Sequence, residues 1–174
     1  SMLLNTTGCR NTAVGRDSSR CNTTGDNNTA MGVDALKLNT TANDNTAVGY
    51  VALTTNTTGG LNAAFGGYAL QDNTTGLQNV AVGISSLENN TTADENTAVG
   101  FRSLYCNTTG AQNTALGALS LDANTTGAQN TGLGVEALGG NTTGASNVAV
   151  GFATMVANTT GANNTSIGHR ALQS

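Results

Sequence analysis

The sequence predicts an all-β protein, a parallel β-solenoid of about ten coils. The first observation is a pentad resembling NTAVG, which begins at every seventeenth residue from Asn11 to Asn164 without a slip. The second is the triplet NTT, which recurs on the same period from Asn5 to Asn158. A repeat of this length is too short for a helical hairpin or a propeller blade, which need about 33 to 45 residues, and it suits one coil of a solenoid.

The repeat is described most simply by numbering it 1 to 17 from the Asn of the pentad. We call the residues at one position in successive coils a column. Position 1 is always Asn, position 5 always Gly, and positions 12 to 14 always NTT. Position 3 is Ala except at Gly132 and Ser166, position 4 is always apolar, and position 9 is Leu except at Ser19 and Met155. The residue type varies at positions 6, 7, 10, 11, 16 and 17, so the repeat does not require a particular side chain there.

One coil, Asn45 to Leu61, illustrates the expected elements. Residues 46–48 (TAV) and 51–53 (VAL) predict two short strands, because apolar and β-branched residues lie between turn signals. The Gly between them suits a corner with positive φ. The NTTG segment, residues 56–59, predicts a turn or a third side, and Asn at positions 1 and 12 tolerates the left-handed conformation at bends.

Stacking explains why polar residues recur as faithfully as apolar ones. Equivalent residues of neighbouring coils lie about 4.8 Å apart, so stacked amides form a ladder along the axis. The two Thr of each NTT are expected to stack through their hydroxyls in the same way. The predicted ladder residues are Asn11, Asn28, Asn45, Asn62, Asn79, Asn96, Asn113, Asn130, Asn147 and Asn164 at position 1, and Asn22, Asn39, Asn56, Asn73, Asn90, Asn107, Asn124, Asn141 and Asn158 at position 12.

The apolar content of one coil is small, and this predicts self-association. We expect positions 4 and 9 to supply the core, at roughly 1.5–3 kcal/mol for each buried side chain. Ordering the backbone of the coil costs roughly 1–2 kcal/mol per residue. Ladder hydrogen bonds and Ala packing fill part of the gap. We therefore expect a homotrimer, built from rods about 48 Å long at about 4.8 Å per coil.

Composition excludes several classes of function. A net charge of −4 with only six scattered basic residues argues against binding of nucleic acid. No apolar run approaches the ~20 residues of a membrane span, so membrane insertion is not expected. Ser1-Met2 is interpreted as a remnant of expression, and residues 3–174 as a single repeat domain, which we expect to be a fragment of a longer fibre.

Enzymatic and metal-binding constellations are not found in the sequence. The single histidine, His169, falls at variable position 6 and is expected to be exposed. The acidic residues form no regular column, unlike calcium-binding solenoids with an Asp in every turn. Cys9, Cys21 and Cys106 have no metal-ligand spacing and are interpreted as fortuitous small residues, with bridging between chains as the alternative. No catalytic residue, cofactor or metal is predicted, and the NTT sequons are interpreted as ladder residues rather than glycosylation sites.

Specific contacts are expected at the variable positions. Interchain or core contacts are one interpretation of the apolar residues at position 6, and a ligand-binding patch for a cell-surface receptor or a glycan is the other. These residues are Tyr50, Ile84, Phe101, Val135 and Phe152.

The pentads NTAVG and NVAVG, followed by xxAL, resemble the head repeats of trimeric autotransporter adhesins of the YadA type. The longer unit with NTTG is similar to repeats in phage tail-fibre and bacterial surface proteins. The resemblance covers essentially the whole chain and implies a left-handed β-roll, trimerisation and an extracellular, cell-surface or virion location. This chain departs from the adhesin unit by extra residues in the NTTG region.

The sequence thus predicts a structural fibre or adhesin segment that forms a rigid trimeric rod for attachment. The alternative from another class is a monomeric ice-binding or water-ordering solenoid that uses its Thr columns, because both NTT threonines recur in every coil. Two observations count against it: adjacent Thr side chains in a strand point to opposite faces, and Asn before with Gly after indicates a turn.

Overall fold

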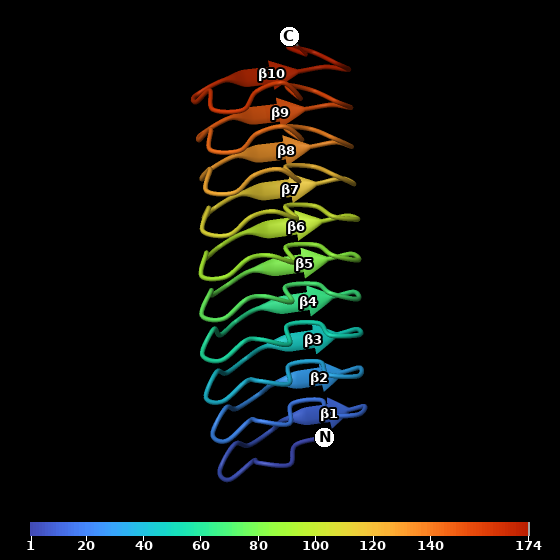
Figure 1. The fold of residues 1–174 in the computed structure, drawn as a ribbon, viewed down its shortest axis with the longest axis vertical. Coiled ribbons are helices and arrows are strands. Elements are labelled where there is room, and N and C mark those ends of the chain that lie inside the picture. The colour runs from blue at the N-terminus through green and yellow to red at the C-terminus, as the bar shows by residue number, and fades with distance from the viewer. Residues whose placement is uncertain (174) are drawn as a thin grey trace.

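The chain winds into a single stack of coils, as the computed structural model of residues 1–173 shows (Figure 1). Each coil contributes one three-residue strand, and the described residues contain no helix. This confirms the predicted all-β parallel solenoid of about ten coils. The strands are β1 (Thr12–Val14), β2 (Thr29–Met31), β3 (Thr46–Val48), β4 (Ala63–Phe65), β5 (Val80–Val82), β6 (Thr97–Val99), β7 (Thr114–Leu116), β8 (Thr131–Leu133), β9 (Val148–Val150) and β10 (Thr165–Ile167).

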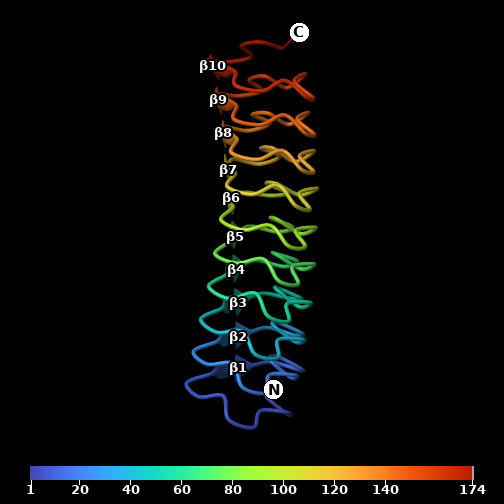
Figure 2. The ribbon, with the colours of Figure 1, turned by 90° about the vertical axis from the view of Figure 1, so that its left-hand side faces the viewer.

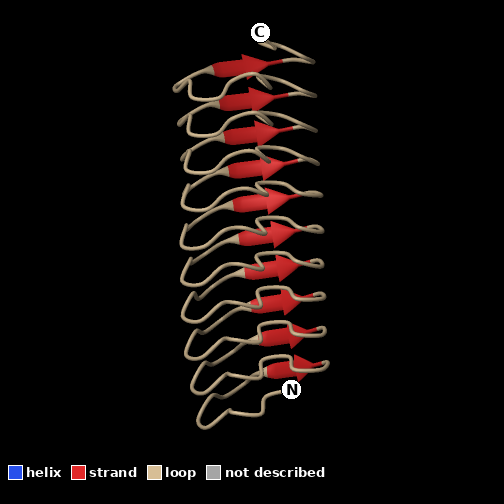
Figure 3. Cartoon of the chain, viewed as in Figure 1, coloured by secondary structure: helices blue, strands red, loops and turns tan. Residues whose placement is uncertain are grey.

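The ten strands form one parallel sheet whose spatial order is the chain order. Pairing joins equivalent positions, as in Ala64 of β4 with Ala81 of β5. Figure 2 shows the strands along one side of the stack, and Figure 3 shows how little of each coil is strand and how much is turn. Because the register never shifts, the residues of one column lie next to one another in successive coils along the rod.

The prediction of a second strand at residues 51–53 and at the equivalent residues of other coils is wrong. Positions 7 and 9 have positive φ, as at Val51 (59°) and Leu53 (51°), and an extended strand requires negative φ. The chain therefore curls through a turn there, which brings the Leu of position 9 inward. The left-handed conformation also falls at position 17, as at Leu61 (61°), and not on the ladder asparagines as expected.

The glycine corner at position 5 is confirmed. Every Gly of this column has a φ between 123° and 142°, a region that residues with a Cβ rarely adopt. The stack adds a second reason, since a Cβ on Gly49 would overlap with the carbonyl oxygen of Gly66 in the next coil. The corner thus needs glycine for both its backbone conformation and the close approach of the neighbouring coil.

The core consists of positions 3, 8 and 9. In the third coil these are Ala47, Ala52 and Leu53, all fully buried, which confirms the prediction for position 9. The prediction that position 4 is a core position is wrong: Val48 is only partly buried and Phe65 is exposed. Side chains alternate across a strand, so the inward Ala of position 3 forces its neighbours at positions 2 and 4 outward.

Hydrogen bonds join neighbouring coils in the turns as well as in the sheet. Backbone N–H groups donate to the next coil from Leu53 to Ala69 O (2.9 Å) and from Thr57 to Thr74 O (2.9 Å). The same pattern recurs at equivalent residues along the stack. Each coil is therefore held to the next around its perimeter, which gives the rod its continuity.

Candidate functional site

The position 12 asparagines form a continuous side-chain ladder inside the rod, as predicted. Asn73 Nδ2 donates to Asn56 Oδ1 of the preceding coil (2.9 Å) and to the Gly76 carbonyl of its own coil (3.0 Å). Its Oδ1 accepts from Asn90 Nδ2 (2.9 Å). Asn73 is fully buried, so all its hydrogen-bonding groups are satisfied by the protein. The buried, engaged amide nitrogen supports the structural interpretation of the NTT sequon.

The position 1 asparagines are also stacked, but they bond chiefly to the backbone. Asn45 Oδ1 accepts the backbone N–H of Asn62 (3.0 Å), and Asn45 Nδ2 donates to the Gly59 carbonyl (2.9 Å). Contacts between amide side chains occur in part of this column, as from Asn79 Nδ2 to Asn62 Oδ1 (3.2 Å). Both asparagine columns therefore hold the coils together, and in the position 1 column only Asn96 Nδ2 is buried without a partner among the described residues.

The two threonines of NTT have different surroundings. At position 13, Thr57 Oγ1 donates to the Thr74 carbonyl of the next coil (3.0 Å), so the expected hydroxyl stacking is replaced by bonds to the backbone. At position 14, Thr58 is exposed. The triplet therefore presents one free Thr column at a turn, not a flat pair of columns.

A regular array that the sequence did not lead us to expect lies on the outside of the sheet. We call the outward residues of positions 2 and 4 the outer sheet face. Alternation in a strand places these two columns on the same side, and the T-x-V pattern was the available signal. Among residues 1–173, no hydrogen bond engages the hydroxyls of its Thr residues, and its position 4 column is wholly apolar. The Thr residues are Thr12, Thr29, Thr46, Thr97, Thr114, Thr131 and Thr165.

The position 6 residues singled out from the sequence lie across the glycine corner from this face. All five are exposed: Tyr50, Ile84, Phe101, Val135 and Phe152. The ring of Tyr50 contacts that of Tyr68 edge-on at 5.4 Å, and Phe152 stacks on the exposed His169 at 5.3 Å. Positions 4 and 6 together form a largely apolar band along the rod, interrupted at position 6 by Arg16, Gly67 and His169.

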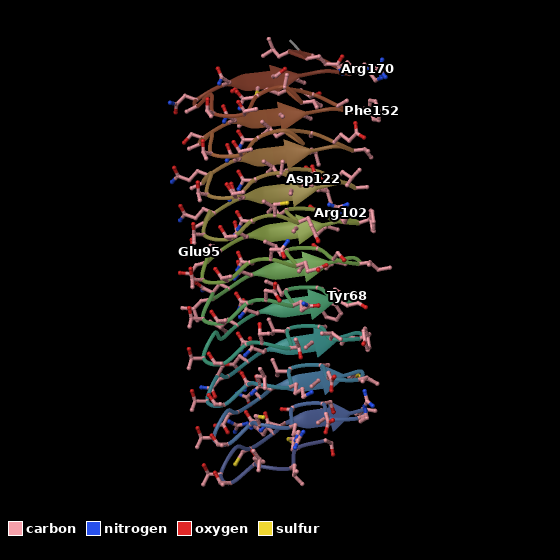
Figure 4. The ribbon with its side chains drawn as sticks, in the orientation of Figure 1. Tyr68, Glu95, Arg102, Asp122, Phe152 and Arg170 are labelled. Atoms are coloured by element: carbon pink, nitrogen blue, oxygen red, sulfur yellow. The ribbon has the colours of Figure 1, made fainter. Side chains whose placement is uncertain are left out.

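One hollow opens on the turn side of the middle coils, with a volume of about 290 Å³. It arises in the position 7 column, where the small Ser85 lies between Tyr68 and Arg102 of the neighbouring coils. The guanidinium of Arg102 lies 4.2 Å from the centre of the Tyr105 ring. Figure 4 shows Tyr68 and Arg102 along the same edge of the rod. Glu88 and Phe101 complete the lining.

Two titratable groups beside the hollow have raised pKa values. Burial raises the pKa of Asp122, and the nearby Arg102 guanidinium offsets part of this rise. Burial also raises the pKa of the Cys106 thiol, with a smaller contribution from the Asp122 carboxylate. A thiol with a raised pKa stays protonated at neutral pH and is a poor nucleophile. Within residues 1–173, no three His, Cys, Asp or Glu side chains are placed to hold a metal ion.

The chain is thus a β-solenoid repeat protein with internal asparagine columns, an apolar band and one aromatic hollow. No family model, curated protein or solved structure matches it. Within residues 1–173, no helix is long and apolar enough to cross a membrane.

Proposed function

We propose that this chain is a rigid structural segment, a left-handed trimeric rod in a fibre or surface adhesin that holds a recognition element away from a cell surface or virion. The carrying observation is the apolar band of positions 4 and 6, which runs along an uninterrupted hydrogen-bonded stack. The left-handed winding follows from the resemblance to adhesin heads. Both the asparagine columns and the apolar band suit a load-bearing rod.

Stiffness is supported by the density of bonds between coils. At each step, strand pairing, turn hydrogen bonds and two asparagine columns join one coil to the next. Bending the rod would break several of these at once and leave buried amides without partners, each at a cost of about 1–3 kcal/mol. A rod of this kind keeps its ends at a fixed separation, which is what a spacer requires.

The trimer is supported by two different columns, of which position 4 is wholly apolar and position 6 largely so. A ring with threefold symmetry needs a heterologous contact, in which one patch meets a different patch of the next copy. Position 4 on the outer sheet face and position 6 across the glycine corner offer such a pair. Position 4 is apolar in every coil, from Val14 to Ile167, so the contact can extend along the whole rod.

Sedimentation equilibrium at micromolar concentration tests this proposal. The trimer predicts a species of about 52 kDa, three times the 17.3 kDa of the chain. Replacing Val82 and Leu116 by Glu places charges in the apolar band and should give a folded monomer, because both side chains already face outward. The matched control replaces Thr92 and Thr126, exposed at position 14, by Glu and should leave the trimer intact. A wild-type monomer would overturn the trimer.

The second candidate, an ice-binding or water-ordering solenoid, is favoured by the outer sheet face rather than by NTT. Its position 2 column has free Thr hydroxyls in two runs of three coils, about 4.8 Å apart within each run, beside an apolar column, and no charged residue occurs in either. Thermal hysteresis at millimolar protein tests it, with Thr97 and Thr114 replaced by Lys as the disrupting variant. An absence of hysteresis in the wild type removes this candidate.

A further inference from the structure

We propose that the hollow between Tyr68 and Arg102 binds one pyranose ring of a neutral saccharide. This inference goes beyond the proposed rod, since a spacer needs no ligand site of its own. The hollow borders the proposed trimer contact, because Phe101 of position 6 is part of its lining, but its other lining residues come from positions 7 and 10 of a single chain.

The shape of the hollow suits a single ring. Tyr68, Ser85 and Arg102 occupy position 7 of three successive coils, so the two large side chains are separated by two coil steps, about 9.6 Å. The short Ser85 leaves the space between them open. The hollow is shallow and open to solvent, and its volume of about 290 Å³ is just below the range of about 300–1,000 Å³ for small-molecule sites. A longer saccharide would extend from the opening along the rod.

The lining combines flat apolar surfaces with hydrogen-bonding groups that the protein leaves unused. Tyr68, Phe101 and Tyr105 present aromatic surfaces for the C–H groups of a sugar ring. Among residues 1–173, neither Glu88 nor Arg102 is in an ion pair. The Arg102 Nε–H is buried without an acceptor, so the guanidinium is held by stacking on Tyr105 and not by hydrogen bonds.

These groups select among ligand classes. A wholly apolar ligand would bury the charges of Glu88 and Arg102 without partners, which is costly. A nucleic acid or an acidic saccharide would meet the Glu88 carboxylate and a chain of net charge −4. A neutral sugar satisfies both sides, because its hydroxyls donate to the carboxylate and accept from the guanidinium while its C–H face covers the rings.

The fold itself gives no reason for this cluster. Positions 7 and 10 vary freely along the chain, and elsewhere position 7 carries residues such as Leu119, Glu136 and Ala153. The chain has only three Phe and three Tyr, and half of these six line the hollow. Aromatic residues gathered at positions that stacking leaves unconstrained indicate a binding surface.

The test is a nuclear magnetic resonance titration of the six aromatic rings with methyl β-galactopyranoside, methyl β-glucopyranoside and methyl α-mannopyranoside. At least one sugar should shift the Tyr68, Phe101 and Tyr105 resonances saturably, with a dissociation constant on the order of 1 mM. Tyr68→Ala and Glu88→Gln should each weaken binding about tenfold or more. Phe152→Ala, exposed at position 6 in another coil, is the matched control and should bind normally.

Two outcomes would overturn the proposal. One is the absence of a saturable shift with all three sugars up to about 50 mM. The other is a set of ring shifts that follow protein concentration and disappear in the Val82→Glu, Leu116→Glu variant, which would assign the hollow to contact with a second copy. Repeating the titration on that variant separates the two proposals, since a monomeric rod retains every lining residue of the hollow.

Discussion

Positions 3 and 4 are neighbours in every strand and recur with equal regularity, yet their surroundings are opposite. Ala81 is fully buried, whereas Val82, the next residue, is 37% exposed. Position 3 admits only Ala, Gly or Ser, whereas position 4 carries Val, Met, Phe, Leu or Ile. Within the strand, regular recurrence therefore shows that residues stack, and the small side chains of position 3 show which side is buried.

The width of the interior explains the restriction at position 3. Position 8 packs directly against it, and Ser86 Oγ donates to the Ala98 carbonyl (3.0 Å). A Cβ on Gly132 would lie 2.6 Å from Ser120 Oγ, so even a methyl group requires a shift there. The rod is thus held by small side chains, one Leu per coil and bonded amides, in place of a wide apolar core.

The largest loss in the free energy of unfolding is expected in the buried asparagine column of position 12. Asn90→Ala removes one bond to Asn73, one to the Ala93 carbonyl and one from Asn107, and it leaves their buried partners unsatisfied. We expect a loss of about 3–5 kcal/mol in the free energy of unfolding. Thr92→Ala, exposed at position 14 in the same triplet, should change it by less than about 0.5 kcal/mol. Urea unfolding followed by circular dichroism measures both, and equal losses would contradict the ladder.

An intermediate effect is expected from inserting the same large side chain on the two sides of one strand. Ala81→Phe overpacks the narrow interior and should cost about 1–3 kcal/mol or more. Val82→Phe reproduces the residue found naturally at Phe65 and should cost less than about 0.5 kcal/mol in an isolated rod. The comparison is made by urea unfolding under conditions where sedimentation has established the oligomeric state.

The result for Val82→Phe is informative whether the loss of stability is large or small. Should Val82→Phe destabilise as much as Ala81→Phe, the outer sheet face would be covered in solution by another copy of the chain. A small effect in a species of about 52 kDa, three times the 17.3 kDa chain, would instead place the contact between copies elsewhere on the rod.

Much of this architecture follows from the sequence, because stacking imposes an invariant period. The parallel sheet, the glycine corner, the buried Leu of position 9 and the asparagine columns were predicted and are present. The turn at positions 7 to 9 was not, because an apolar pair such as Ala52-Leu53 suits a strand or a left-handed turn equally well, and only the φ of Leu53 distinguishes them.

The candidate site was predictable only in part. The exposed apolar residues of position 6 were identified as contact residues. The hollow depends on a small residue between two large ones in successive coils, and it appears only when the sequence is aligned by columns. In such an alignment, Tyr68, Ser85 and Arg102 stand one above another.

The smallest effect is expected at Asp122, which is half-buried. Burial raises its pKa more than the attraction of Arg102 lowers it, so the folded state binds the proton more tightly than the unfolded chain. As pH rises from the ordinary carboxyl range through the raised pKa, the folded state therefore loses stability, because ionisation is harder there than in the unfolded chain. Below the ordinary carboxyl range the group is protonated in both states and there is no loss. Asp122→Asn should raise the melting temperature by about 1 °C at pH 7 and leave it unchanged in acid. A lower melting temperature at pH 7 would mean that attraction to Arg102 outweighs burial at this site.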